Sequence, residues 1–158
     1  FNRGGSKLRE MTEEKVGIVK AVCISDRKGV QKKNVGKARF LENFGLENDA
    51  HGGSWHRQVS LLSYEVIEDF KAKGAPVEDG AFGENLIVTG FDFKNCPIGT
   101  KFSCNSVILE MTQIGKTCHK GCEIQKIMGD CIMPREGVFA RVLQGGEISV
   151  GDKMRMIE

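Results

Sequence analysis

The chain lacks the features that place a protein in a membrane. No stretch of its 158 residues approaches the roughly 20 consecutive apolar residues that a membrane-spanning helix needs. No charged segment followed by an apolar segment opens the chain, as a secretory leader would. We therefore expect a cytoplasmic protein that does not bind membranes.

The chain also lacks a large excess of positive or negative charge. The formal net charge is +2, from 23 basic and 21 acidic residues. Residues 1–10 carry this small excess and show no hydrophobic period, and we interpret them as the disordered remnant of an expression tag. The domain expected over residues 11–158 is then balanced in charge, which gives no reason to expect nucleic-acid binding.

The length and the apolar pattern indicate one β-rich domain. Domains usually contain roughly 100 to 200 residues, so this chain holds one core. Short apolar segments alternate with turn signals, and segment 30–53 is compatible with either short strands or a functional loop. This pattern favours a single, mainly β, barrel-like domain with a few short helices. The expected strands cover residues 17–25, 58–62, 85–89, 101–103, 107–112, 138–143 and 153–157.

Two short helices are expected beside these strands. Ser63 is a suitable N-cap for a helix that runs to about Lys73. A second helix is expected over residues 120–128, which places Cys118 and Cys122 near its N-terminus.

The six cysteines are expected to be reduced, since disulfides are rare in the cytoplasm. Cys23 and Cys104 lie in apolar runs and are assigned to packing. Cys118 differs, because a helix N-terminus and nearby Lys116 favour its thiolate form. We therefore predict Cys118 as the reactive thiol.

Two neighbours of Cys118 are predicted to take part in its chemistry. His119 adds a further donor beside the thiol, and Cys122, four residues on, is a candidate resolving thiol. A second interpretation makes Cys118, His119, Cys122 and Cys131 a zinc site, although their spacing is irregular. A third makes the thiols incidental to a partner-binding module.

A second polar cluster lies in segment 51–58, which holds the only tryptophan. Its glycines permit close approach of the backbone, while His51, His56, Arg57 and Gln58 offer polar groups to an anionic ligand. The alternative is an ordinary solvated loop.

Glu84 and Asn85 open a later strand, after Gly83. They can orient a histidine or accept a hydrogen bond from a ligand. Acidic residues at a strand edge also commonly just face water.

Four segments resemble the MOSC family, named for the C-terminal domain of molybdenum cofactor sulfurase, and in particular its small bacterial stand-alone members. The segments are DAHGGSWHRQVSLL at 49–62, FGEN at 82–85, TQIGKTCH at 112–119 and GDCIMPREGVF at 129–139. The resemblance covers about residues 14–158. It implies a barrel-like β fold and a role in handling sulfur for molybdenum enzymes, with Cys118 at the position of the family's cysteine.

The resemblance also implies a site. Cys118 would carry sulfur as a persulfide or ligate molybdenum, and the loop at 51–58 would receive the molybdenum cofactor (molybdopterin). Arg57, Lys116 and Arg135 would neutralise the cofactor's phosphate. The activity would be that of a sulfurtransferase or of a sulfur carrier without turnover.

The resemblance further implies which partners the chain has. The full sulfurase has a pyridoxal phosphate domain that this chain is too short to include, so pyridoxal phosphate is not expected here. Sulfur would come from a separate donor protein, and the acceptor would be the cofactor or the enzyme that carries it.

Overall fold

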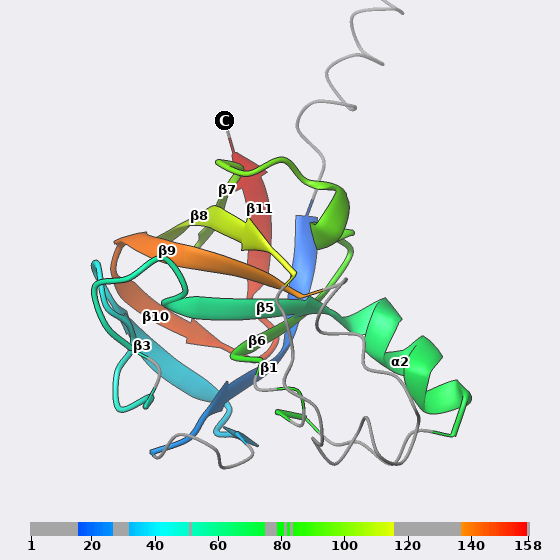
Figure 1. Ribbon diagram of the computed structural model, residues 1–158. Helices are drawn as coiled ribbons and strands as arrows, with labels where there is room; N and C mark the ends of the chain where they lie inside the picture. The colour runs from blue at the N-terminus through cyan, green and yellow to red at the C-terminus, as the bar shows by residue number, and fades with distance from the viewer. Residues whose placement is uncertain are drawn as a thin grey trace, which may run out of the picture.

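The computed structural model describes residues 16–26, 32–50, 52–74, 79–80, 82, 84–115 and 137–157. The expected tag remnant at residues 1–10 and the expected helix at 120–128 lie outside the described residues. Within them the chain consists mostly of strands (Figure 1). In chain order the elements are β1 (Val16–Ile24), β2 (Lys33–Asn34), β3 (Lys37–Leu41), β4 (Gly45–Leu46), β5 (Val59–Ser63), α2 (Tyr64–Ala72), β6 (Leu86–Thr89), the 3-10 turn η1 (Phe93–Asn95), β7 (Lys101–Cys104), β8 (Val107–Ile114), β9 (Val138–Gln144), β10 (Gly146–Ser149) and β11 (Lys153–Ile157).

Seven of these strands close into a barrel. They pair in the order β11-β7-β8-β9-β5-β6-β1, and β1 also pairs with β11, which closes the sheet. The pairings are antiparallel except for β5 with β6, which is parallel. The predicted mainly β, barrel-like single domain is confirmed.

A smaller sheet of order β10-β3-β4 lies at one end of the barrel (Figure 1). Its register pairs Phe40 with Gly146 and Ala38 with Ile148. Phe40 and Ile148 are buried and join the barrel core. Segment 30–53 therefore contains short strands, as one of the two interpretations had it, whereas β10 was not predicted.

β5 is buried on both faces, and this explains its uninterrupted apolar sequence. Alternate residues of a strand point to opposite faces. Val59 and Leu61 belong to the core inside the barrel, while Leu62 packs outside it with Ile67 and Phe70 of α2. The helix thus covers the outer face of β5.

The predicted first helix is confirmed. It begins after Ser63 as N-cap and has Lys73 as its C-cap, and Gly74 follows with a φ of 100°, a left-handed conformation that favours glycine. Among the described residues, no helix combines the length and the apolar character needed to span a bilayer.

Candidate functional site

The ends of β8 and β9 define one rim of the barrel. The N–H of Gly115, directly after β8, donates to the carbonyl oxygen of Gly137, directly before β9, at 2.5 Å. Segment 116–136 is therefore attached to the barrel at two adjacent points. The predicted site residues Lys116, Cys118, His119, Cys122 and Arg135, together with Cys131, fall within this segment and lie outside the described residues, as does His51.

A β-bulge in β8 turns this rim toward the loop at residues 52–58. Met111 pairs with Ala140 and Gln113 with Phe139, so Thr112 is an extra residue in the ladder. A bulge interrupts the alternation of side chains and can redirect one of them. Both Thr112 and Gln113 contact the loop as a result, since each bonds to His56.

His56 is held by its backbone and by its ring. The hydroxyl of Thr112 donates to the carbonyl oxygen of His56, and the ring Nε2 lies 2.8 Å from Oε1 of Gln113. Gln113 is itself oriented, because its Nε2 donates to the carbonyl oxygen of Gly115 at 2.8 Å. The imidazole is thus linked to the residue from which segment 116–136 departs.

Arg57 packs against two aromatic rings. Its guanidinium carbon is 4.9 Å from the ring centroid of Trp55 and 5.5 Å from that of Phe139. These cation–π contacts fix the plane of the guanidinium group. Its Nε is buried and has no hydrogen-bond partner among the described residues. A buried donor without an acceptor is costly, so this atom indicates an acceptor supplied from elsewhere.

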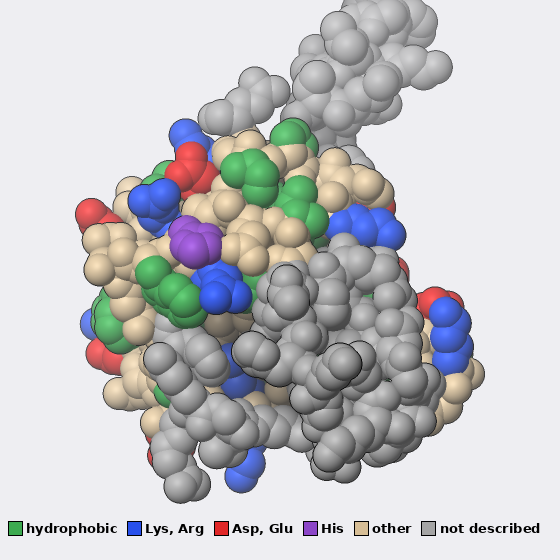
Figure 2. All heavy atoms as spheres, viewed as in Figure 1, with side chains coloured by type: hydrophobic (Ala, Val, Ile, Leu, Met, Phe, Trp, Pro, Cys, Tyr) green, Lys and Arg blue, Asp and Glu red, His purple; other side chains and the backbone are tan. Residues whose placement is uncertain are grey.

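These groups share one face of the molecule. Trp55 is 39% exposed, and its ring meets that of His56 edge-on with centroids 6.0 Å apart. Figure 2 shows a histidine beside hydrophobic and Lys or Arg side chains on this face. We call His56, Arg57, Trp55 and Gln113 the rim cluster.

Gln58 was predicted as a cofactor contact, but the described contacts engage both ends of its amide inside the fold. It is fully buried; its Nε2 donates to Oδ1 of Asn43 and its Oε1 accepts from the N–H of Val142, both at 2.9 Å. Gln58 therefore ties the loop to β9. Direct contact with a cofactor stays a prediction for this residue.

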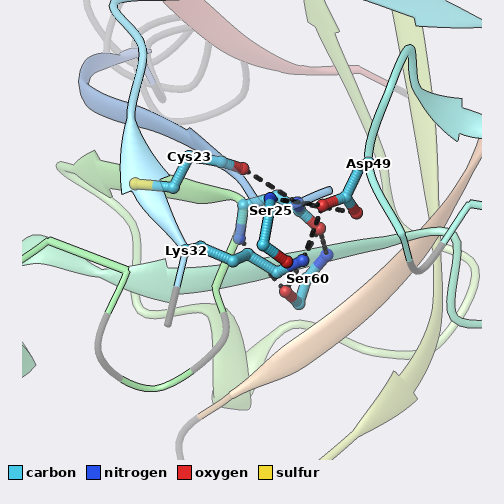
Figure 3. A network of polar contacts seen from close by, with 6 residues as sticks. Cys23, Ser25, Lys32, Asp49 and Ser60 are labelled. Atoms are coloured by element: carbon cyan, nitrogen blue, oxygen red, sulfur yellow. Dashed lines mark hydrogen bonds and ion pairs between the residues drawn. The ribbon is translucent and has the colours of Figure 1, made fainter. Parts of the chain in front are cut away.

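A buried polar network holds the other end of the loop (Figure 3). Lys32 is 1% exposed, and its Nζ lies 2.7 Å from Oδ1 of Asp49, whose side chain is fully buried. Asp49 also accepts from the N–H of Ser25 at 3.1 Å and from Nδ2 of Asn85 at 3.2 Å. The network fixes Asp49, and with it the start of the segment that leads to the rim cluster.

Asn85 connects this network to three strands. Its Oδ1 accepts from the N–H of Ser60 in β5 at 3.0 Å, and its Nδ2 donates to the carbonyl oxygen of Cys23 in β1 at 3.0 Å. Asn85 itself precedes β6. Its predicted role as a ligand contact is untested, and the role that the structure shows is to join β1, β5 and the loop.

Glu84 is fully buried and holds a turn. Its Oε2 accepts from the N–H of Gly80 and its Oε1 from the N–H of Phe82, both at 2.9 Å. Burial raises the pKa of Glu84 to about 7, although the two N–H donors act in the opposite direction. Its part in cofactor binding also stays a prediction.

This pKa predicts how stability depends on pH. The pKa of Glu84 in the folded protein lies above the value of about 4.3 in the unfolded chain, so the folded state holds the proton more tightly. The resulting stabilisation of the folded state is fully present below about pH 4.3 and is lost as the pH rises toward 7. In the wild type, this ionisation should lower the free energy of unfolding by about 3 kcal/mol between pH 4 and about 7, and Glu84→Gln should abolish that loss. Urea unfolding across this range measures it, with the exposed Glu47→Gln as control. Parallel pH profiles for wild type and Glu84→Gln would contradict the prediction.

The described cysteines behave as packing residues. Cys23, Cys96 and Cys104 are buried. Burial raises the pKa of the Cys23 thiol well above its usual range and that of Cys104 to about 12. The assignment of Cys23 and Cys104 to packing is confirmed. Among the described residues, no group of three or more His, Cys, Asp or Glu side chains could hold a metal ion.

Comparison with known protein families identifies the family of this chain. Residues 48–155 match the MOSC domain family. The chain belongs to this family. The MOSC family is known for sulfur handling related to the molybdenum cofactor.

Two relatives show how much of a longer protein this chain matches in sequence. "Uncharacterized protein YflK" of Bacillus subtilis (strain 168) is 27% identical over 142 residues, which are 82% of this chain and 63% of the relative. A protein named "Reductase" from Gibberella moniliformis (strain M3125 / FGSC 7600) is 29% identical over 132 residues, which are 75% of this chain and 24% of the relative. The MOSC chain thus spans less than two thirds of each relative's length.

Solved structures share the fold. The YuaD protein of Bacillus subtilis superposes with a TM-score of 0.74 at 20% identity and covers 89% of this chain and 95% of its own. YiiM from Geobacillus stearothermophilus gives a TM-score of 0.68 at 18% identity, over 90% of this chain and 75% of its own. At these identities the likeness supports the MOSC fold alone.

Proposed function

We propose that this MOSC domain binds the molybdenum cofactor and handles sulfur through Cys118, as a persulfide carrier or as a ligand of molybdenum. The observation that carries the proposal is the rim cluster beside Gly115 and Gly137. Its guanidinium has a buried Nε without a partner among the described residues. Cys118 follows Gly115 by three residues in the sequence.

The donors of the rim cluster suit an oxyanion. Arginine presents a planar set of N–H groups that matches phosphate geometry, and aromatic packing orders it before a ligand arrives. Arg57 would contact the cofactor's phosphate, together with Lys116, Arg135 and His51. The cofactor would supply the molybdenum centre, while these side chains would bind it and neutralise its charge.

Three buried residues would support cofactor binding indirectly, by fixing the main chain around the site: Gln58, Glu84 and Asn85. Gln58 accepts from the N–H of Val142 in β9, Asn85 donates to the carbonyl oxygen of Cys23 in β1, and Glu84 accepts from the N–H of Gly80 in the turn before β6. A site on a rigid scaffold keeps its donors close to the ligand without a further loss of conformational freedom. This support favours a preformed binding surface.

Cys118, with His119 and Cys122 beside it, would perform the sulfur chemistry. The Cys118 thiolate would attack a donor's sulfur–sulfur bond, form a new sulfur–sulfur bond to the transferred atom, and release the shortened donor. A separate donor protein would supply that sulfur, and the acceptor would be the cofactor or its enzyme. The same thiolate suits a molybdenum ligand.

Mass spectrometry of the intact chain tests this proposal. After treatment with inorganic polysulfide, we expect an adduct with the mass of one sulfur atom, mapped by peptide analysis to Cys118 and removed by a reductant. Cys118→Ser should lose it, whereas Cys104→Ser, a change in the core, should keep it. Absence of the adduct from Cys118 would contradict the carrier role.

A pterin assay tests the ligand role. If Cys118 ligates molybdenum, native protein purified without a tag should contain pterin and molybdenum in equal amounts, and Cys118→Ser should lose the metal. Pterin and metal that are both absent from native protein would contradict cofactor binding.

A further inference from the structure

The turn that leads into the rim cluster begins at Asp49. The carbonyl oxygen of Asp49 accepts from the N–H of Gly52 at 3.1 Å, and the N–H of Gly53 donates to the carbonyl oxygen of Phe44 at 2.8 Å. Gly52 also packs so closely against the ring of Phe44 that an added Cβ would clash with it. Both ends of the turn are therefore fixed, and Trp55 follows two residues after Gly53.

The main chain of Asp49 is held in place by its own side chain. Nζ of Lys32 lies 2.7 Å from Oδ1 of Asp49, and both side chains are at most 1% exposed (Figure 3). Two other described donors to this carboxylate, the N–H of Ser25 and Nδ2 of Asn85, are neutral. A buried carboxylate that loses its counter-charge is driven toward water. Lys32 therefore keeps Asp49 inside the fold, and the turn with it.

The far end of the same loop is anchored as well. Oε1 of Gln58 accepts from the N–H of Val142 in β9 at 2.9 Å. Arg57 is the neighbour of Gln58 in the chain, and its guanidinium carbon lies 4.9 Å from the ring centroid of Trp55. With this end fixed, the position of Trp55 against Arg57 depends on the other anchor, Asp49.

We infer that Lys32 is a positioning residue of the rim cluster, and that it acts through Asp49 on the packing of Trp55 against Arg57. The inference rests on the proposed function and deepens it, because a guanidinium ordered by aromatic packing binds an oxyanion with less loss of conformational freedom. Lys32 acts from inside the fold and makes no contact with the ligand. Such coupling between distant residues is shown by combining variants.

The Nε–H of Arg57 reports this packing without any ligand. It is buried and lies beside two aromatic rings, so it should give a separate ¹H–¹⁵N signal, which Arg57→Lys identifies by its loss. Lys32→Met should shift this signal or remove it through faster exchange with water. Lys73→Met, which removes an exposed lysine at the end of α2, should leave it unchanged. A wild-type signal in folded Lys32→Met would overturn the inference.

A second control separates positioning from a general loss of stability. Phe102→Leu removes volume from the barrel core, where the ring of Phe102 meets those of Phe91 and Phe93. It should lower stability, as Lys32→Met does, but keep the wild-type signal of Arg57. The same change of the Arg57 signal in Phe102→Leu would overturn the inference, because any destabilised variant would then show it.

A double variant removes the cost of the unpaired charge. Lys32→Met combined with Asp49→Asn leaves no buried charge at this position, so stability should partly return. An amide has one oxygen, however, and cannot accept from both Ser25 and Asn85 as the two carboxylate oxygens do. The Arg57 signal should therefore still differ from the wild type. A wild-type signal in this variant would overturn the inference, even if Lys32→Met alone fails to fold.

The pterin that copurifies with native protein tests the consequence for binding. We expect Lys32→Met to lower the pterin content about tenfold, the lower end of the effect expected for Arg57→Gln. In an Arg57→Gln background, Lys32→Met should lower it no further, because both changes act on the same guanidinium. A further tenfold loss in that background would overturn the inference. Failure of the proposed function gives a different result, no pterin even in the wild type, and the Arg57 signal then decides the role of Lys32.

Discussion

Replacement of Lys32 by methionine is expected to lower the free energy of unfolding by about 3–5 kcal/mol, because the Asp49 carboxylate would stay buried without its counter-charge. The ion pair is 2.7 Å long and both side chains are at most 1% exposed. Two other donors to Asp49 among the described residues, the N–H of Ser25 and Nδ2 of Asn85, are neutral and cannot replace a full charge. Urea denaturation of both proteins measures the difference.

Two further variants separate the buried charge from the loss of a lysine. Lys73→Met removes a cation that pairs with Asp69 at 3.7 Å on the exposed face of α2, and should cost less than about 1 kcal/mol. Lys32→Met combined with Asp49→Asn removes both charges, so it should cost less than Lys32→Met alone. A loss below about 1 kcal/mol for Lys32→Met would contradict a buried pair at this position.

The second large effect is expected at Arg57. Hydrogen bonds to charged groups contribute about 1.5–3 kcal/mol, so Arg57→Gln should weaken binding of an oxyanion ligand ten- to hundredfold. Arg57→Lys should also weaken it, because lysine keeps the charge but lacks the donor at Nε that has no partner among the described residues. The pterin that copurifies with native protein, oxidised to a fluorescent form and counted per chain, measures the effect.

The matched control is Arg141→Gln, an exposed arginine on β9. It removes the same charge from the same protein but leaves the rim cluster intact. Thermal unfolding should show that Arg57→Gln is folded. Equal pterin content in Arg57→Gln and Arg141→Gln would show that general positive charge, and not the guanidinium packed against Trp55 and Phe139, attracts the ligand.

Much of the barrel could be predicted because its signals are local. Alternating apolar residues set β1, β7, β8 and β11, and the helix lies between Ser63 and Gly74, the residues from which its ends were predicted. β10 was missed because its four residues include two polar ones and one glycine, and only pairing with β3 makes them a strand. Short strands depend on partners that a local pattern does not contain.

The candidate site was predictable in part. Arg57 and His56 were selected for their donor groups, and the structure brings them together around Trp55. Gln113 and Lys32 were missed. Gln113 reaches His56 because the bulge at Thr112 redirects it toward the loop. Lys32 is followed by Lys33, and adjacent lysines in a sequence usually indicate a solvent-exposed segment.

The amino-acid sequence by itself determined where α2 and most of the longer strands form and which polar residues gather near positions 51–58, because hydrophobic alternation and turn residues act over a few neighbouring positions. Only the tertiary structure decided which polar groups are buried. Asp49 lies 17 residues from Lys32 and 36 from Asn85, and closing the barrel brings all three together out of water. In that low-dielectric interior each buried charge or polar group needs a partner close to it in space. Such partners can be far apart in the sequence, so a local pattern does not reveal them.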